Sequence, residues 1–362
     1  MKKILCTMTA IAMAASMLAG CSGSSAEKTT TAAAAAETTA AAETTAAATE
    51  AAAPAETAAA EAAKEQVSVG VIQFMQHGSL DEAYEGFLDG LAEAGYKEGE
   101  NLTVNFQNAS GEVSNCQQIC NLFANSDTDL VLAIATPAAQ AAANVFQETD
   151  VPVLFTAVTD AVGAGLVDSN EAPGKNVTGT LDMPVIADQI AVIKDVLPDA
   201  QKLAILYTSS EANSEIQAEE AKAAAEALGM EVIIQTSSSS NDIPQVISSV
   251  VGSADAIYIP SDNAFASAMA TVNSTAVENQ IPVFCAVEAM IAEGGIATTA
   301  INYYELGKQT AAQAVRVFNG EKASEIAVET QKECALVVNE TFAKSVGVEI
   351  PAEIVEKAAT KY

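Results

Sequence analysis

The stretch VSVGVIQFMQHGSLDEAYEGFLDGLAEAG, residues 67–95, establishes the fold class of this 362-residue chain. It opens with a short β-branched apolar run, Val67–Phe74, which is typical of a strand that is buried on both faces. After a polar break, apolar side chains recur at helical spacing over Asp81–Ala94 and place Phe87 and Leu91 on one face. A buried strand followed by an amphipathic helix predicts a parallel sheet that is covered by helices.

The same unit recurs along the chain in two consecutive series. The first series has predicted strands at Val67–Phe74, Leu102–Phe106, Leu130–Ala135 and Val153–Thr156, and helices at Asp81–Ala94, Val113–Asn125 and Ala138–Phe146. The second has strands at Lys202–Tyr207, Val232–Gln235, Ala256–Pro260 and Val283–Cys285, and helices at Ala212–Leu228, Ile243–Val251 and Ala264–Glu278. Two such series predict an α/β fold of two doubly wound, Rossmann-like lobes instead of one very wide sheet.

The segment Ile296–Gly320 begins as a strand and becomes a helix, so we expect it to cross back to the first lobe. Hinge crossings are predicted near residues 181, 300 and 326. Lobe 1 is then residues 66–180 plus 300–325, and lobe 2 is residues 181–299 plus 326–362.

The N-terminus predicts export. Two lysines after Met1 precede the apolar run Ile4–Leu18, and small residues follow, which is typical of a secretory signal over residues 1–20. The four residues that end at Cys21 resemble a bacterial lipobox, which implies cleavage before this cysteine and a lipid on its sulfur. The alternative is an ordinary secretory signal with an incidental cysteine. Residues 21–65 carry the anchor and a segment of Ala, Thr, Glu and Ser, which predicts a disordered tether.

Charge and cysteine content limit the function classes. The formal net charge of −31 excludes a nucleic-acid surface, since phosphate binding needs a basic stripe, and Arg316 is the only arginine. Cys116 and Cys120 share one face of a predicted helix, but two ligands without a third make a poor metal site, so no metal is expected. Cys285 and Cys334 are the only plausible disulfide pair, and the sequence leaves that pairing open.

Polar residues follow the predicted strands at the points where ligands bind in open α/β sheets. They are Gln76 and His77, Thr136-Pro137-Ala138, Thr156, Ala157 and Asp160 in the first lobe, and Glu211, Asn213, Asp262, Asn263 and Glu288 in the second. Thr136 either presents a helix N-terminus to an anion or merely caps its own helix. The four acidic residues are candidates to hold an ammonium group, because a desolvated cation needs a nearby carboxylate.

No pattern in the chain indicates an enzyme. Nucleophile-elbow, zinc-protease and phosphate-loop motifs are missing from the sequence, and the single histidine, His77, has no nucleophile beside it. The string Gly163-Ala164-Gly165 lacks the third glycine of a dinucleotide motif, so no cofactor and no catalytic residue are expected.

Several strings together carry a family resemblance. They are Gln76-His77 with Leu80-Asp81, Ala133–Gln140, Phe155–Asp160, Leu206-Tyr207 with Glu211–Ser214, and Ser261–Asn263. With these strings the chain resembles the ABC transporter substrate-binding lipoproteins that include tryptophan- and tyrosine-binding members. Many members have Glu-His-Pro where this chain has Gln76-His77-Gly78, so one charge is missing here.

The resemblance implies a type I periplasmic-binding fold whose lobes close around an amino acid or a similar small solute. It implies that Thr136, Ala138, Thr156 and Ala157 hold the ligand carboxylate. It also implies that Asp160, Glu211, Asn213, Asp262 and Asn263 supply polar closure.

The expected function is capture of a solute by hinge closure at the outer face of the cell membrane, for an ABC permease and its ATPase. Two alternatives remain open from the sequence. One is a sensor lipoprotein that uses the same clamp to signal to a membrane partner, and the other is an enzyme with a carboxylate pair in the cleft.

Overall fold

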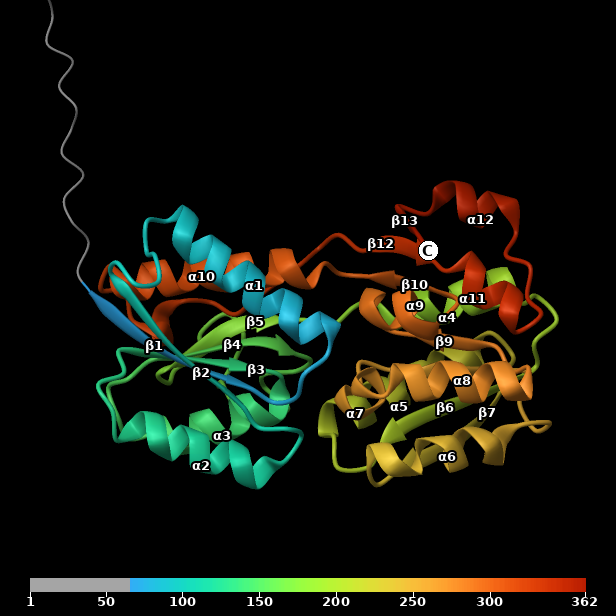
Figure 1. Cartoon of the computed structure of the whole chain (residues 1–362), viewed down its shortest axis with the longest axis horizontal. Helices are drawn as coiled ribbons and strands as arrows, with labels where there is room; N and C mark the ends of the chain where they lie inside the picture. The colour runs from blue at the N-terminus through green and yellow to red at the C-terminus, as the bar shows by residue number, and fades with distance from the viewer. Residues whose placement is uncertain (1–65) are drawn as a thin grey trace, which may run out of the picture. The chain divides into compact units, whose positions relative to one another are not determined.

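The computed structural model describes residues 66–362. The predicted signal peptide, Cys21 and the tether fall in residues 1–65 and lie outside the described residues. Among the residues that are described, no helix is long and apolar enough to cross a membrane. The described part forms two α/β lobes, each with a central sheet that is covered by helices (Figure 1).

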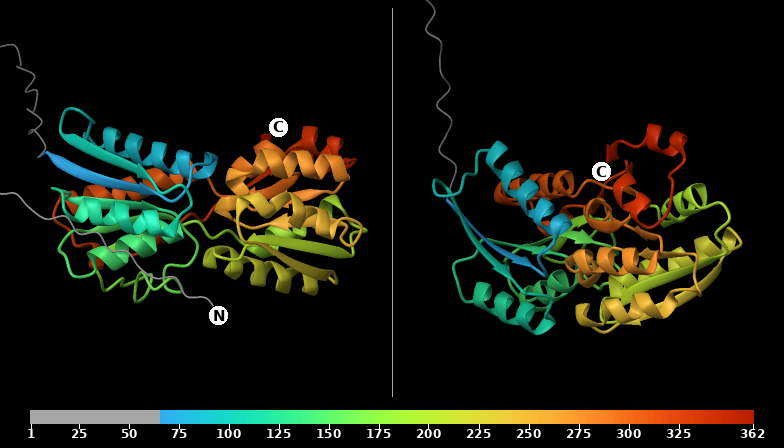
Figure 2. Two further views of the ribbon diagram at one scale, coloured as in Figure 1. Left: turned by 60° about the horizontal axis from the view of Figure 1, so that its bottom comes forward. Right: turned by 45° about the vertical axis from the view of Figure 1, so that its right-hand side comes forward.

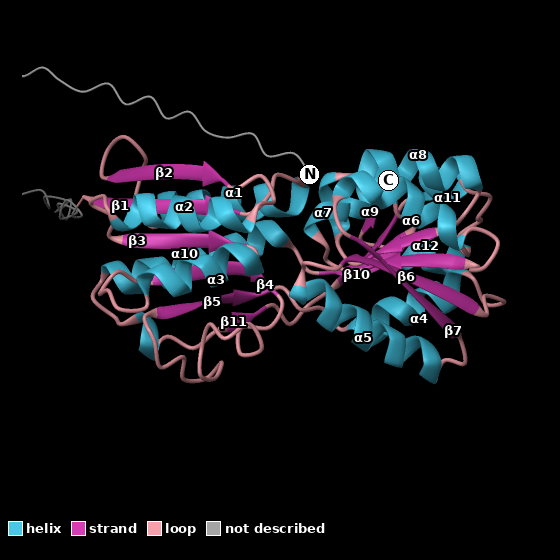
Figure 3. Cartoon of the chain, turned by 90° about the horizontal axis from the view of Figure 1, so that it is seen from below, coloured by secondary structure: helices cyan, strands magenta, loops and turns pink. Residues whose placement is uncertain are grey.

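Lobe 1 is built on a six-stranded sheet in the order β2-β1-β3-β4-β5-β11, and all its neighbouring strands are parallel (Figure 3). The strands are β1 (Val67–Gln73), β2 (Leu102–Asn108), β3 (Leu130–Ile134), β4 (Val153–Val158), β5 (Val177–Leu181) and β11 (Glu329–Thr330). One face carries α1 (Gly78–Glu93) and α10 (Tyr303–Phe318), and the other carries α2 (Val113–Ala124) and α3 (Thr136–Phe146) (Figure 1). A short 3-10 helix spans Ala323–Glu325.

Lobe 2 has a parallel sheet in the order β7-β6-β8-β9 and a second sheet in the order β10-β12-β13. Its strands are β6 (Lys202–Thr208), β7 (Glu231–Ser237), β8 (Ala256–Ile259), β9 (Val283–Cys285), β10 (Ala297–Ala300), β12 (Ala335–Val338) and β13 (Thr360–Lys361). Its helices are α4 (Ile186–Val196), α5 (Ala212–Ala227), α6 (Ile243–Val250), α7 (Asn263–Ser267), α8 (Met269–Asn279), α9 (Glu288–Gly294), α11 (Glu340–Ser345) and α12 (Ala352–Lys357), with a 3-10 helix at Ser240–Asp242. The helices α4 and α5 lie on the opposite side of the larger sheet from α6 and α8 (Figure 3).

Three segments of chain connect the lobes. They are residues 182–185 between β5 and α4, 301–302 between β10 and α10, and 331–334 between β11 and β12. The third segment follows residue 330, a few residues beyond the predicted crossing near 326, because Glu329 and Thr330 still pair with β5 of lobe 1. The second and third segments are tied together, since the Gln331 side chain accepts from the Asn302 N–H at 3.0 Å and donates to its carbonyl at 2.6 Å.

The predicted helix Ala264–Glu278 is wrong as a single element. The structure has two helices, α7 and α8, which meet at Ala268 with φ −112° and ψ 19°. Asp262 caps α7 by accepting the N–H of Phe265 at 3.0 Å, so this short helix is held by the loop after β8. Neither glycine nor proline marks the break, which is why periodicity alone joined the two helices.

Helices α1 and α10 are in backbone contact along lobe 1 (Figure 2). A methyl group added at Gly86 would overlap the carbonyl oxygen of Tyr304, and one added at Gly307 would overlap that of Ala83. Only glycine therefore permits this approach. The contact also fixes the position of His77 relative to Tyr303, because α1 begins directly after His77 and α10 begins at Tyr303.

The four cysteines within residues 66–362 are all free, so the structure contains no Cys285–Cys334 disulfide. Cys285 is buried at the end of β9, whereas Cys334 is exposed on the third crossing, so the two lie in different environments. Cys116 and Cys120 are buried, as their shared helix face predicted. Over the same residues, no group of three or more His, Cys, Asp or Glu side chains is placed to hold a metal ion.

We expect a thiol reagent to modify Cys334 in the folded protein and to reach the three buried cysteines only after unfolding. Burial raises the pKa of Cys116 to about 11 and that of Cys120 to about 12, so these thiols stay protonated as well as shielded. Peptide mapping by mass spectrometry after timed alkylation checks this, with Cys334→Ser as the control. Early modification of Cys116, Cys120 or Cys285 would contradict it.

Candidate functional site

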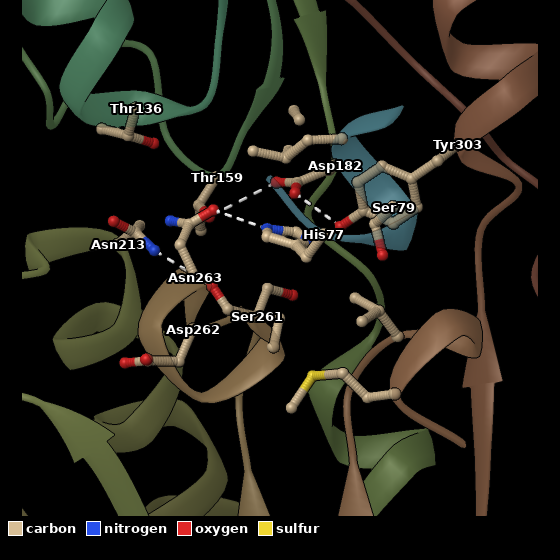
Figure 4. Close-up of a pocket in the computed structure, with 15 residues that line it drawn as sticks. His77, Ser79, Thr136, Thr159, Asp182, Asn213, Ser261, Asp262, Asn263 and Tyr303 are labelled. Carbon is tan, nitrogen blue, oxygen red and sulfur yellow. Dashed lines mark hydrogen bonds between the residues drawn. The ribbon is translucent and has the colours of Figure 1, made fainter. Parts of the chain in front are cut away.

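A cavity lies between the two lobes, where the carboxyl ends of their strands face each other (Figure 4). It encloses about 330 Å³ of space that no atom fills, part of which is open to solvent. Its lining residues are His77, Ser79, Leu80, Thr136, Ala157, Thr159, Asp182, Asn213, Ser261, Asp262, Asn263, Ala266, Val287, Met290 and Tyr303. They come from both lobes and, at Asp182, from the first crossing segment, so one bound molecule would touch both lobes.

The N-terminus of α3 opens onto this cavity. Thr136, the first residue of the helix, lines the cavity, and the cap position before it belongs to Ala135, with φ +81°. No side chain caps this helix, so the alternative that Thr136 merely caps its own helix is wrong. The uncapped N–H groups of the first turn and the positive end of the helix dipole favour an anion such as a carboxylate here.

A bulge in β4 sets the wall next to α3. The register of β4 against β5 shifts between Phe155 and Val158, and Ala157 within the bulge has φ +56°. A non-glycine residue in this left-handed region costs on the order of 1 kcal/mol or more and is found mostly at functional sites. The bulge leaves Thr156 inside the sheet, where its hydroxyl accepts from Thr180 at 3.0 Å, and places Ala157 on the cavity wall.

Asp182 is the acidic residue of the first crossing, and it is almost wholly buried at the cavity wall. Its carboxylate accepts the hydroxyl of Tyr303 at 2.7 Å and the hydroxyl of Thr159 at 3.3 Å (Figure 4). Burial raises the pKa of this carboxyl, and the two hydroxyl donors counteract that shift in part. No lysine or arginine is among the lining residues, so the carboxylate has no basic side chain of the cavity beside it.

Several polar atoms of the cavity are shielded from solvent and have no hydrogen-bond partner within the described chain. They include Nδ1 of His77, the hydroxyl oxygen of Ser79 and the side-chain oxygen of Asn213. Unpaired buried polar atoms cost free energy, and native proteins keep few of them. Their concentration in one cavity indicates a place built to complete its hydrogen bonds with a bound molecule.

Asp262 and Glu211, two sequence candidates of lobe 2, both accept N–H groups at the start of α7. Asp262 accepts from the Thr208 N–H at 2.6 Å and from the Thr208 hydroxyl at 2.9 Å, besides its helix cap. Glu211 accepts the N–H groups of Asn263 and Ala264, both at 3.0 Å. Burial and the nearby Asp262 raise the pKa of Glu211, and burial also raises the pKa of Asp262. Both carboxyls are therefore occupied in building the loop.

Two hydrogen-bond paths join the lobes across the cavity. His77 of lobe 1 lies 3.1 Å from the Asn263 side-chain oxygen of lobe 2. Gln217 on α5 donates to the Thr159 hydroxyl at 3.2 Å and accepts the Ser261 N–H at 2.9 Å. Side chains of the two lobes are therefore in direct contact beside the cavity.

Six of the residues proposed from the sequence line the cavity: His77, Thr136, Ala157, Asn213, Asp262 and Asn263. Three of the others are turned away from it. Gln76 is exposed, the Asp160 carboxylate accepts the N–H groups of its own turn at Val162 and Gly163, and Glu288 accepts the Tyr362 hydroxyl. Pro137, Ala138, Thr156 and Glu211 are buried behind the cavity wall.

Sequence reasoning missed Asp182, on the first crossing, and Tyr303, which directly follows the second crossing at the start of α10. The strand before Asp182 reads Val-Thr-Gly-Thr-Leu and has no apolar run, so it was not recognised as a strand. Ser79, Thr159 and Ser261 were also missed as cavity residues, although each stands within a few residues of a candidate. Inspection of every residue that follows a strand, including strands rich in threonine, would have found Asp182.

Apolar side chains form the remaining part of the wall. Leu80 from α1, Ala266 from α7, Val287 before α9 and Met290 on α9 all line the cavity. Methionine adapts its shape and makes favourable contacts with aromatic rings. The cavity thus combines an uncapped helix N-terminus, a buried carboxylate and an apolar region.

Comparison with known proteins identifies the family. The model of the ABC transporter substrate binding protein family matches residues 68–362. The chain belongs to this family. This substrate-binding protein is 38% identical over 283 residues to a tyrosine-binding protein of Clostridioides difficile (strain R20291), a match that covers 78% of this chain and 81% of the relative.

Two solved structures relate the fold to bound and free states. An ABC domain from Streptococcus pneumoniae in complex with L-Trp is 35% identical, with a TM-score of 0.79 over 82% of this chain and 100% of that one. A ligand-free, open substrate-binding protein with adhesive properties from Clostridium difficile is 38% identical, with a TM-score of 0.62 over 81% of this chain and 98% of that one. The substrate-binding protein described here has the type I periplasmic-binding fold of two Rossmann-like lobes, as predicted from the sequence.

Proposed function

We propose that this substrate-binding protein captures an aromatic amino acid, tyrosine or tryptophan, and delivers it to an ABC importer. The observation that carries the proposal is the pairing of opposite charges across the cavity: the uncapped N-terminus of α3 on one wall and the Asp182 carboxylate on another. An α-amino acid carries a carboxylate and an ammonium group on the same carbon atom. The cavity therefore offers one partner for each.

The proposed pose follows from these two groups. The ligand carboxylate lies at Thr136 and accepts N–H groups of the first turn of α3. The helix N-terminus thus takes the role that an arginine side chain has in many carboxylate sites. The ammonium group lies at Asp182 and forms an ion pair with the carboxylate, which the hydroxyl groups of Tyr303 and Thr159 already orient. A buried cation paired in this way keeps Asp182 ionised in spite of its burial.

The apolar region supports an aromatic side chain. Leu80, Ala266, Val287 and Met290 provide a surface on which a planar ring can pack. The relatives agree with this assignment, since one is a tyrosine-binding protein and another is a structure in complex with L-Trp.

The mechanism is hinge closure. This chain is more similar in shape to the L-Trp complex than to the open, ligand-free structure, although its sequence identity to the open one is higher. That difference supports a clamp whose lobes close on the ligand and are then held by contacts such as His77 with Asn263. The predicted lipid at Cys21 would hold the clamp at the outer face of the membrane, and the tether would give it reach to the permease.

Isothermal titration calorimetry against amino acids and their fragments tests the proposal. Tyrosine and tryptophan should each bind with one ligand per chain. Tyramine, which lacks the carboxylate, and 3-(4-hydroxyphenyl)propionate, which lacks the ammonium group, should bind roughly 100-fold more weakly or worse, because each leaves one buried charged site unpaired. Binding of a sugar or nucleoside instead, with no heat from any amino acid, would overturn the proposed function.

A further inference from the structure

His77 is the single histidine of the chain, and its two ring nitrogens meet different surroundings. Nε2 lies 3.1 Å from the side-chain oxygen of Asn263 on the opposite lobe. Nδ1 belongs to the same cavity-lining ring, is shielded from solvent and has no partner within residues 66–362. Nε2 is therefore hydrogen-bonded within the protein, whereas Nδ1 remains without a partner among the described residues and could bind a ligand.

A fixed amide decides which nitrogen carries the hydrogen. The Asn263 side-chain nitrogen donates to Oε2 of Glu211 at 2.6 Å, and the same oxygen accepts the backbone N–H of Asn263. Oε2 and Oε1 of Glu211 each accept a backbone N–H group, from Asn263 and Ala264, and an ionised carboxylate has no hydrogen to donate, so the amide nitrogen of Asn263 faces Glu211. Its amide oxygen must then face His77 (Figure 4).

The histidine tautomer follows from that orientation. An amide oxygen only accepts, so Nε2 of His77 has to donate and carries the hydrogen. Burial lowers the pKa of His77, while the bond to Asn263 and the charge of Asp81 raise it in part, and the neutral ring is the form that burial favours. In a neutral ring with hydrogen on Nε2, Nδ1 is a bare acceptor.

We propose that Nδ1 of His77 accepts a hydrogen bond from the side chain of the bound amino acid, so that the site selects tyrosine or tryptophan over phenylalanine. This inference rests on the proposed function, in which the ligand's carboxylate and ammonium group have their partners at α3 and Asp182. The side chain then supplies the remaining donor. The tyrosine hydroxyl and the tryptophan indole N–H are both donors, whereas phenylalanine has none.

The expected selectivity comes from an unmade hydrogen bond. Phenylalanine would fill the apolar region equally well but would leave Nδ1 unpaired and cut off from water. Leaving a buried acceptor unsatisfied should weaken phenylalanine binding by roughly 10- to 100-fold relative to tyrosine. Glu211 and Asn263 thereby influence which amino acid is bound without contacting its side chain, because Glu211 orients Asn263 and Asn263 fixes the tautomer of His77.

Calorimetry with tyrosine, tryptophan and phenylalanine tests the selectivity in the wild-type protein and in His77→Phe. We expect the substitution to weaken tyrosine and tryptophan by roughly 10-fold or more while phenylalanine changes little, so that the preference collapses. Gln76→Ala, at the exposed neighbour, is the matched control and should leave all three affinities unchanged. His77→Gln, which keeps a donor and an acceptor, should restore part of the preference if His77→Phe folds poorly.

The outcomes separate the inference from the function on which it rests. Equal affinity of the wild-type protein for all three amino acids, or equal losses in His77→Phe, would overturn the inference and leave amino-acid capture standing. Absence of binding to any amino acid would remove both. Because His77 is the only histidine, long-range ¹H–¹⁵N correlation of the tyrosine-saturated protein reports its tautomer without assignment. A hydrogen found on Nδ1 would also contradict the inference.

Discussion

Asp182→Asn is expected to weaken the binding of tyrosine and tryptophan more than any other single polar substitution in the cavity. The change keeps the size of the side chain and an oxygen that can accept from Tyr303 or Thr159, but it removes the charge. The ligand ammonium group would then be buried without a counter-ion. Loss of one partner of a buried charge pair costs about 2 to 5 kcal/mol, so the dissociation constant should rise by roughly 30- to 5,000-fold.

The matched control for this substitution is Asp160→Asn. Asp160 was also a candidate for the ammonium group, yet its Oδ1 accepts the N–H groups of Val162 and Gly163 and the residue does not line the cavity. Asparagine retains that oxygen, so the turn should persist and the affinity should stay at the wild-type value. Calorimetry on both variants decides between the two carboxyls. A large loss in Asp160→Asn, or none in Asp182→Asn, would contradict the assignment.

Gly307→Ala is expected to lower the free energy of unfolding by about 3 kcal/mol. The added methyl group would meet the carbonyl oxygen of Ala83 and the backbone nitrogen of Phe87, and neither backbone atom can turn aside as a flexible side chain does. Helices α1 and α10 would have to separate. Because His77 precedes α1 and Tyr303 begins α10, affinity for the ligand should fall together with stability.

Gly90→Ala provides a graded comparison on the same helix pair. Its new methyl group would lie 2.7 Å from the methyl carbon of Ala311 and 3.2 Å from Cα of Lys308, but it would not overlap a carbonyl oxygen as the one at Gly307 does. Alanine gains about 1 kcal/mol of helix propensity over glycine at either position, so the loss of stability should be smaller than that of Gly307→Ala. Urea denaturation followed by circular dichroism measures both variants. Equal stability of the two proteins would show that the helices are not in obligatory backbone contact.

The sequence predicted the architecture well because buried parallel strands are short, β-branched and apolar. Runs such as Leu130–Ile134 and Lys202–Thr208 were found nearly at their observed bounds. The loops after such strands supplied His77, Thr136 and Asn263 as cavity residues for the same reason, since carboxyl ends of parallel strands meet at one edge. The fold and six of the fifteen residues that line the cavity thus follow from local patterns.

The rest depends on contacts that no local pattern reveals. Glu211 and Asp160 are acidic residues in suitable loops, but their oxygens are consumed by backbone N–H groups of their own lobes. Asp182 follows a strand that is rich in threonine and glycine and therefore lacks the apolar pattern of a buried strand. Tyr303 reaches the cavity only because the chain crosses between the lobes a second time. Which carboxylate remains available is therefore a tertiary property.

The hydrogen bond from Tyr303 to Asp182 joins the first connecting segment to the residue that directly follows the second, and both segments would bend in the proposed hinge closure. Asp182 opens the first of these segments, and Tyr303 directly follows the second. An ammonium group bound at Asp182 would lie at the hinge between the lobes. A small displacement there would produce a large displacement at the outer edges of the lobes. The contact between the ligand ammonium group and the Asp182 carboxylate would then affect both ligand binding and the angle between the lobes.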